Sequence, residues 1–103
     1  MAGKTPKFRA PVYPGRILKE DLLDPLGLSV NRLAVELRVP ANRLTQIVNG
    51  LRAITPDTSI RLGRYFGFSP EFWHNLQKHY EFEVARRTTQ ARIERTVRPR
   101  EAA

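Results

Sequence analysis

Hydrophobic residues recur at intervals of three and four along most of the chain, which is the spacing of one buried face of an α-helix. The first such run starts at Pro14, a residue suited to the first turn of a helix, and Leu18, Leu22 and Leu23 repeat at helical spacing. Asp24-Pro25 ends the run, and Gly27 makes the following turn. The pattern therefore predicts a first helix that starts at residue 14 and ends at Asp24-Pro25.

Two short helices joined by a tight turn are predicted next, over Ser29–Leu37 and Ala41–Asn49. Ser29 is a favourable N-cap, and Gly50 supplies the left-handed residue that ends the second of these helices. The two helices are separated by Arg38-Val39-Pro40. The residues expected to face inward are Leu33, Ala34 and Leu37 on the first helix and Leu44, Ile47 and Val48 on the second.

Two further helices begin with the same signal, which is a capping hydroxyl, then a proline, then an acid, at Thr55-Pro56-Asp57 and at Ser69-Pro70-Glu71. The fourth helix buries Leu62 and Phe66 together with either Ser59 or Ile60, and it stops at Gly67. The fifth helix extends through Val84 toward an arginine-rich tail. Its aromatic and apolar side chains are expected to belong mainly to the core, with a dimer seam as the alternative; they are Phe72, Trp73, Leu76 and Tyr80.

The fold class predicted from these patterns is all-α, with five helices and an extended C-terminal helix. Residues 1–13 contain two prolines and scattered basic side chains without an apolar period, and we interpret them as a flexible basic arm. Residues 14–85 form the helical domain, and residues 86–103 form an arginine-rich tail. With 103 residues, the chain has the size of one domain with a single small core.

Composition excludes several classes of protein. The chain has no cysteine, which rules out disulfides, a thiolate nucleophile and any cysteine-based metal site. It has no apolar run long enough to span a membrane and no secretory leader, so we expect a cytoplasmic protein without a membrane partner. Serine and threonine fall mainly at helix caps, and no glycine-rich phosphate loop is present. Glu71, His74 and His79 do not supply a complete ligand set for a metal. The sequence therefore predicts neither an enzyme nor a cofactor or metal site.

Charge points to a polyanionic partner. The net charge is +8, from 18 lysines and arginines against 10 acids, and such an excess usually indicates nucleic acid. The excess is concentrated at the two ends, since residues 14–83 carry nine basic against eight acidic side chains. From Val39 to Ala53, however, there is no acid. The second helix of the turn therefore presents a locally basic surface within a nearly neutral domain.

The polar face of the helix at residues 41–49 carries the residue types that recognise bases in DNA. Asn and Gln pair with adenine, Arg pairs with guanine, and the methyl group of Ala or Thr can contact thymine. Arg38 and Arg52 flank this helix and are expected to contact phosphates, which position a protein without selecting a sequence. The residues predicted to face the DNA groove are Ala41, Asn42, Arg43, Thr45, Gln46 and Asn49.

These segments resemble a known family. The stretch Leu28–Gly50 is similar to the XRE, or phage-repressor-like, helix-turn-helix. Six further segments resemble the HigA/VapI antitoxins over about residues 13–85, namely Tyr13-Pro-Gly-Arg-Ile-Leu18, Pro25-Leu-Gly-Leu-Ser29, Ile47-Val-Asn-Gly50, Arg52-Ala-Ile-Thr-Pro-Asp-Thr58, Arg61-Leu62 and Ser69-Pro-Glu-Phe-Trp73. The resemblance implies a homodimeric antitoxin of a type II toxin–antitoxin system. Such a protein binds double-stranded operator DNA, represses its own operon and neutralises a HigB-type toxin, an mRNA endonuclease.

The chain departs from the family pattern at two positions. Arg16 stands where the family usually has an acid, and Arg38 stands where the turn often has glycine. Two other functions remain open from the sequence, which are a stand-alone XRE-type regulator without a toxin and a protein-interaction module that does not bind DNA. For the tail at residues 86–103, the alternatives are a solvated extension, a DNA backbone contact and a toxin contact.

Overall fold

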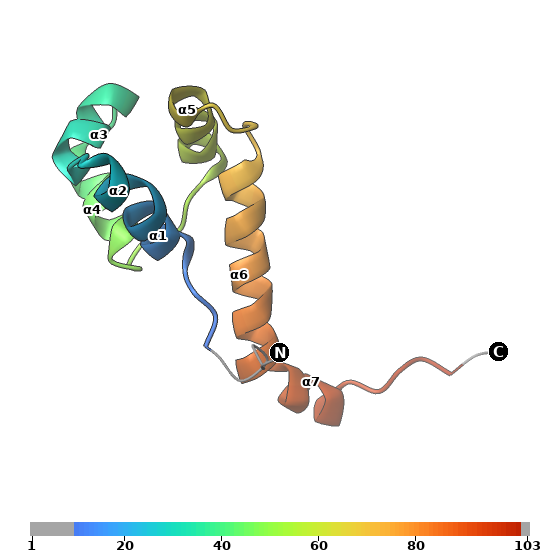
Figure 1. The fold of residues 1–103 in the computed structure, drawn as a ribbon. Helices are drawn as coiled ribbons and strands as arrows, with labels where there is room; N and C mark the ends of the chain where they lie inside the picture. The colour runs from blue at the N-terminus through green and yellow to red at the C-terminus, as the bar shows by residue number, and fades with distance from the viewer. Residues whose placement is uncertain (1–9, 102–103) are drawn as a thin grey trace, which may run out of the picture.

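The protein is described here by a computed structural model that covers residues 10–101. Every regular element within this range is helical, which confirms the all-α class (Figure 1). Most of the expected basic arm, residues 1–9, lies outside the described residues. The elements are α1 (Pro14–Ile17), η2 (Leu18–Leu23), α2 (Asp24–Leu26), α3 (Val30–Leu37), α4 (Ala41–Val48), α5 (Pro56–Phe66), α6 (Phe72–Thr88) and α7 (Gln90–Thr96).

The first three elements form one continuous helical run that continues past Asp24-Pro25, where the sequence predicted its end. Its middle section, η2, is a π-helical turn in which the Asp24 N–H donates to the carbonyl of Lys19, five residues earlier. A proline has no N–H and clashes with the carbonyl of the preceding turn, and π turns are one way in which helices absorb such a residue. Gly27, with a φ of 63°, then ends the run.

The hydrophobic core lies where the first helical run, α3, α4, α5 and the start of α6 meet. The backbones of α1 and α4 approach each other closely at Gly15, because a Cβ atom built there would lie 1.7 Å from the carbonyl oxygen of Ile47. Trp73 of α6 is 1 % exposed and has the largest buried side chain. The sequence also singled out most of the other buried apolar residues, namely Leu18, Leu23, Leu33, Ala34, Leu37, Leu44, Ile47, Val48 and Leu62. It did not assign Ile54, which is 2% exposed.

The start of α6 depends on Ser59 of α5. The prediction that Ser69 caps this helix is wrong, because α6 begins at Phe72 and no side chain caps it locally. The buried Ser59 hydroxyl instead accepts a hydrogen bond from the His74 N–H at 2.8 Å and donates one to the Pro70 carbonyl at 2.7 Å. One free N–H of the first helical turn is thus satisfied from a neighbouring helix. Of the two alternatives in the sequence, Ser59 is buried and Ile60 is exposed.

Ser59→Ala is expected to lower the free energy of unfolding by about 1–3 kcal/mol, because it leaves the part-buried His74 N–H and Pro70 carbonyl without their partner. Thermal or urea denaturation of the purified protein measures this change. Ser69→Ala is the matched control, since it removes the same hydroxyl from the exposed position that the sequence pattern favoured. A larger effect at Ser69 than at Ser59 would contradict this account of how α6 begins.

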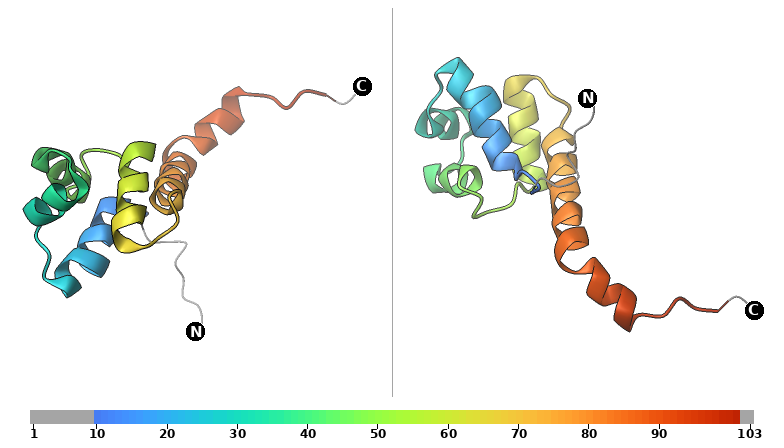
Figure 2. Two further views of the ribbon diagram at one scale, coloured as in Figure 1. Left: turned by 90° about the horizontal axis from the view of Figure 1, so that it is seen from above. Right: turned by 60° about the horizontal axis from the view of Figure 1, so that its bottom comes forward.

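The second half of α6 leaves the domain. The buried residues of α6, Trp73 and Gln77, both lie in its first two turns, and α7 has no buried residue. Figure 2 shows α6 and α7 extending away from the other helices, and the described residues measure 56 × 36 × 23 Å. The domain boundary expected at residue 85 falls inside α6, and α7 adds a sixth helix to the five predicted. Within residues 10–101, no helix has the length and hydrophobicity needed to cross a membrane.

Candidate nucleic-acid interface

The turn between α3 and α4 has the geometry that the sequence predicted. The Ser29 hydroxyl caps α3 by accepting a hydrogen bond from the Arg32 N–H at 3.0 Å. α3 ends at Arg38, whose φ of 62° is the single positive value among the described non-glycine residues. The Val39 N–H donates to the Ala34 carbonyl at 3.0 Å, which is the hydrogen bond of a Schellman-type helix end. The backbone of Arg38 is thus left-handed, which costs about 1 kcal/mol, and this turn places α4 across α3.

Helix α4 has one buried face and one polar face. Leu44, Ile47 and Val48 are buried, and Gly15 of α1 packs against the backbone of α4 at Ile47. The opposite side is exposed at Ala41, Asn42, Thr45 and Asn49, while Arg43 and Gln46 are half-buried. The Thr45 hydroxyl donates to the Ala41 carbonyl at 3.1 Å, so its methyl group is the part left for a partner. The structure therefore places five of the six predicted groove-facing residues on one short helix, with the sixth, Asn49, as its C-cap.

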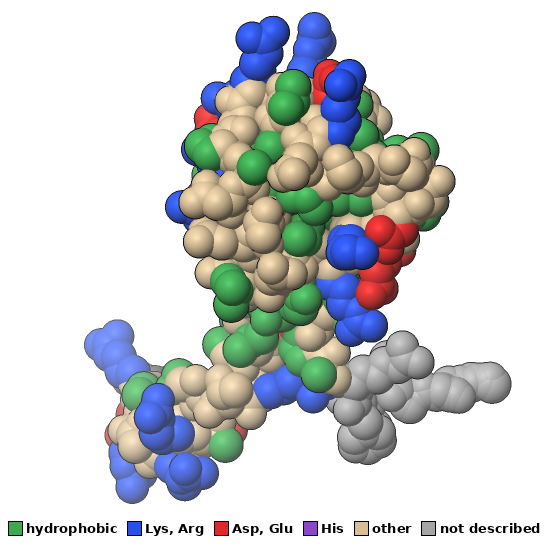
Figure 3. All heavy atoms as spheres, turned by 90° about the vertical axis from the view of Figure 1, so that its left-hand side faces the viewer, with side chains coloured by type: hydrophobic (Ala, Val, Ile, Leu, Met, Phe, Trp, Pro, Cys, Tyr) green, Lys and Arg blue, Asp and Glu red, His purple; other side chains and the backbone are tan. Residues whose placement is uncertain are grey.

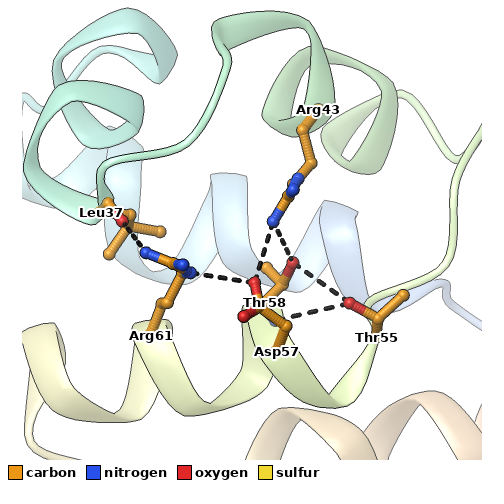
Figure 4. A network of polar contacts seen from close by, with 6 residues as sticks. All are labelled: Leu37, Arg43, Thr55, Asp57, Thr58 and Arg61. Carbon is orange, nitrogen blue, oxygen red and sulfur yellow. Dashed lines mark hydrogen bonds and ion pairs between the residues drawn. The ribbon is translucent and has the colours of Figure 1, made fainter.

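Arg43 is held in a polar network that the sequence did not indicate (Figure 4). Its Nη1 lies 3.0 Å from Oδ2 of Asp57 and 3.5 Å from the Thr58 hydroxyl, both at the start of α5. The same carboxylate oxygen accepts from Nε of Arg61 at 2.9 Å, and Nη1 of Arg61 donates to the Leu37 carbonyl at 2.8 Å. Asp57 and Arg61 therefore connect the end of α3 with the first turn of α4 through α5.

The network changes the acidity of its carboxylate. Hydrogen bonds from Arg61 and Arg43, together with their positive charges, hold the pKa of Asp57 below its ordinary value of 3.8, against a smaller opposing effect of burial. A carboxylate whose pKa is depressed on folding stabilises the folded state above its unfolded pKa. That contribution is lost as the pH falls through the folded pKa. The position of α4 against α5 should therefore weaken only in acid, below about pH 4.

Asp57→Asn is expected to lower the melting temperature at neutral pH, because the arginines of α4 and α5 lose their shared counter-charge. The difference from wild type should stay constant from pH 7 to about pH 5 and shrink as the pH falls below about 4. Circular dichroism melts across this range measure it. Asp21→Asn is the control, since Asp21 is exposed and makes no ion pair within the described residues. Equal melting curves for wild type and Asp57→Asn at pH 7 would contradict the stabilising role.

Two more predicted residues lie at the ends of α4. Arg38 is exposed in the turn before the helix, and Arg52 is exposed in the loop after it. A hollow of about 340 Å³ between α4 and α5 is lined by Arg43, Arg52 and Arg61, together with Thr55, Asp57 and Thr58. Figure 3 shows the side of the molecule that carries α3 and α4, with lysine and arginine side chains at its upper edge and around the C-terminal segment.

The loop after α4 is anchored by a residue that the sequence did not single out. Gln77 of α6 is buried, and its Oε1 accepts a hydrogen bond from the Ile54 N–H at 3.0 Å. Its Nε2 donates to Glu81 at 3.0 Å, so the amide is satisfied on both sides. Gln77 therefore fixes the loop that carries Arg52 onto α6. No sequence signal marks a pairing between positions 23 residues apart.

Comparison with known proteins assigns the family. The helix-turn-helix family model matches residues 18–73, more than half of the chain. Virulence-associated protein I of Dichelobacter nodosus is 42% identical over 80 residues, which cover 78% of this chain and 74% of that protein. A HigA-family addiction module antidote protein from Coxiella burnetii is 44% identical, with a TM-score of 0.82 over 89% of this chain and 100% of that one. The chain belongs to the HigA/VapI family of XRE-type helix-turn-helix proteins.

The resemblance found in the sequence is thus confirmed for the family. Antitoxin HigA of Pseudomonas aeruginosa, solved with the higBA promoter, superimposes with a TM-score of 0.83 and 39% identity over 86% of this chain and 97% of its own. HigA/VapI proteins are helix-turn-helix antitoxins and regulators and not enzymes, as the sequence led us to expect. Among residues 10–101, no group of three His, Cys, Asp or Glu side chains is placed to hold a metal ion.

In this HigA/VapI chain a basic residue lies near the start of the first helix. The Nε of Arg16 lies 3.0 Å from Oε2 of Glu20 one turn later. Both side chains are about half exposed, so the pair stabilises the helix only weakly. The acid at Glu20 therefore supplies the partner that makes a basic residue tolerable near this helix N-terminus.

Proposed function

We propose that this protein is the antitoxin of a type II toxin–antitoxin pair and the repressor of its own operon. In this proposal it binds double-stranded operator DNA as a homodimer and neutralises a HigB-type toxin. The main support is the exposed polar face of α4, carried on a helix-turn-helix whose relative from Pseudomonas aeruginosa was solved with its promoter. A dimer bound at the promoter would exclude RNA polymerase sterically.

The proposed contacts divide into two classes. Asn42 and Gln46 would read base edges in the major groove, and the methyl groups of Ala41 and Thr45 would contact thymine, with Asn49 at the end of the same face. Arg38 and Arg52 would bind phosphates on the two sides of the groove. Arg43 would reach a base or a phosphate once its ion pair with Asp57 opens.

A homodimer is supported by apolar side chains that the monomer leaves exposed. Leu51 after α4 is 77% exposed and Phe82 on the distal half of α6 is 59% exposed, and neither has core to pack against. Two-fold pairing is the usual way in which such surfaces are covered. It would also place two α4 helices about one DNA turn, roughly 34 Å, apart and would predict a palindromic operator.

The test combines two measurements on the full chain. Fluorescence anisotropy compares the DNA upstream of the gene with a scrambled duplex of equal length, and sedimentation gives the oligomeric state. Preference for the upstream DNA by a dimer is the expected result. Co-expression with the adjacent gene product should relieve growth arrest and yield a co-purifying complex. Operator binding without such a complex would favour a stand-alone regulator, and loss of all DNA preference would favour a protein-interaction module.

A further inference from the structure

Four arginines near the C-terminus stand apart from the rest of the protein. Every residue from 91 to 101 is exposed, and α7 contributes nothing to the core. Within the described residues, no ion pair or hydrogen bond engages the side chains of these arginines, and the one acid of α7, Glu94, accepts from Gln90 at 2.8 Å. We call them the C-terminal arginines, and they are Arg92, Arg95, Arg98 and Arg100.

Most arginines of the folded domain, in contrast, form ion pairs within the chain. Arg16, Arg32 and Arg61 each pair with an acid four residues away in the same helical run. Arg43 pairs across helices with Asp57, and Arg86, on the last turns of α6, pairs with Glu83. The folded part therefore pairs these five guanidinium groups internally and leaves Arg38 and Arg52 for the phosphate contacts proposed above. The C-terminal arginines have no such ion pair within the described residues, so their charge is available to a partner outside the chain.

Helix α6 determines where this charge lies. It has 17 residues and is buried only through its first two turns. It therefore carries α7 away from the core, as Figures 1 and 2 show. Figure 1 places α7 and the segment after it at the end of the molecule away from α3 and α4, and Figure 3 shows basic side chains at this lower end. A polyanion bound at α4 would meet the C-terminal arginines only if it extends well beyond α4.

We propose that the C-terminal arginines bind phosphates of the operator duplex outside the base pairs that α4 reads. This inference rests on the proposed function. The planar guanidinium donates hydrogen bonds in the geometry that phosphate accepts, and such contacts carry no base preference. A protein surface is a poorer match, because Ile93 and Val97 are the only exposed large apolar side chains of this segment. The segment would therefore add affinity and leave sequence recognition to α4.

The experiment uses the full chain and two duplexes, one with the operator alone and one with the operator flanked by about one helical turn of unrelated sequence on each side. The main variant is the quadruple R92Q/R95Q/R98Q/R100Q. Two double variants are compared with each other, R92Q/R95Q in the C-terminal segment and R64Q/K78Q in the domain. The two doubles remove the same net charge, and Arg64 and Lys78 are exposed on α5 and α6. Equal melting temperatures establish that all variants are folded.

On the flanked duplex, each lost phosphate contact should make the slope of log affinity against log salt shallower by about one unit. The quadruple variant should therefore lose up to about four units and bind on the order of tenfold or more weakly at low salt, while R64Q/K78Q matches wild type. On the trimmed duplex, the difference between the quadruple variant and wild type should largely disappear.

Two results would overturn the inference: a quadruple variant with the wild-type slope and affinity on the flanked duplex, or a loss in R64Q/K78Q equal to the loss in R92Q/R95Q. The inference and the proposed function fail in distinguishable ways. If wild type binds operator and scrambled duplex equally while the salt slope still depends on the C-terminal arginines, operator recognition fails and the phosphate contact stands. If wild type prefers its operator and the quadruple variant is unchanged, only the phosphate contact fails.

Discussion

Gly15→Ala is expected to lower the free energy of unfolding by about 3 kcal/mol, the largest stability effect that the structure implies for one methyl group. The added Cβ would lie 1.7 Å from the carbonyl oxygen of Ile47 and 2.9 Å from Cα of Val48. These are backbone atoms of α4, so no side-chain rotation relieves the overlap. Helix α1 must move away from α4 and open the core beneath Ile47.

The melting temperature of Gly15→Ala should fall by more than about 10 °C, given a loss of 4–8 °C per kcal/mol for a domain of this size. Gly27→Ala is the matched control. Its Cβ meets no atom within 4 Å, so that variant has only the strain of a residue with a φ of 63°, about 1 kcal/mol. A Gly15→Ala protein as stable as Gly27→Ala would show that α1 and α4 do not pack backbone to backbone.

The same contact has a functional consequence. Helix α4 rests on the backbone of α1 through Gly15 and on α5 through the Arg43–Asp57 ion pair. These two supports engage α4 one helical turn apart, at Ile47 and at Arg43. A short helix of eight residues has little stability of its own. Its orientation toward a DNA groove is therefore set by these tertiary contacts rather than by its own sequence.

Sequence periodicity was sufficient for the features that depend on neighbouring residues. The spacing of Leu33, Ala34 and Leu37 predicted the buried face of α3, and the caps at Ser29 and Thr55 are confirmed by hydrogen bonds to the third residue beyond each. The resemblance to the helix-turn-helix placed Arg38 at a turn position that is often glycine, and the structure shows a positive φ there. In each case the physical cause lies within one helical turn of the residue.

Features that depend on distant residues were not predicted. Ser69 has the local signature of a cap, but the hydrogen bond at the start of α6 comes from Ser59, which is ten residues away in the sequence and close in space. The partner of Arg43 is 14 positions away at Asp57. Both depend on how α5 packs, and no periodic pattern records that packing. An arginine that appeared free to read a base is consequently paired in the folded monomer.

Helix α7 was missed for a different reason. Apolar residues thin out after Ala85, and apolar spacing is the signal by which the other helices were found. The segment Gln90–Thr96 is rich in Gln, Ala, Arg and Glu, which favour helix through their intrinsic propensity without any burial. Its helicity therefore comes from backbone preference and charged side chains.

The decisive functional result is expected from N42A/Q46A. Both amides lie on the polar face of α4, and no hydrogen bond engages either side chain within the described residues. Their removal should therefore leave the fold intact. Each bidentate amide–adenine pair contributes about 1–3 kcal/mol of discrimination against the wrong base. The preference for the operator over a scrambled duplex should fall on the order of thirtyfold or more, while binding to scrambled DNA changes little.

Arg52→Gln provides the contrast that assigns this effect to base reading. Arg52 lies in the loop anchored by Gln77 and is expected to contact a phosphate, so its loss should weaken binding to operator and scrambled duplex alike. The salt slope should become shallower by about one unit, and the ratio of the two affinities should stay at the wild-type value. If N42A/Q46A instead behaves like Arg52→Gln, α4 contacts only the DNA backbone, and recognition of the operator must come from another surface.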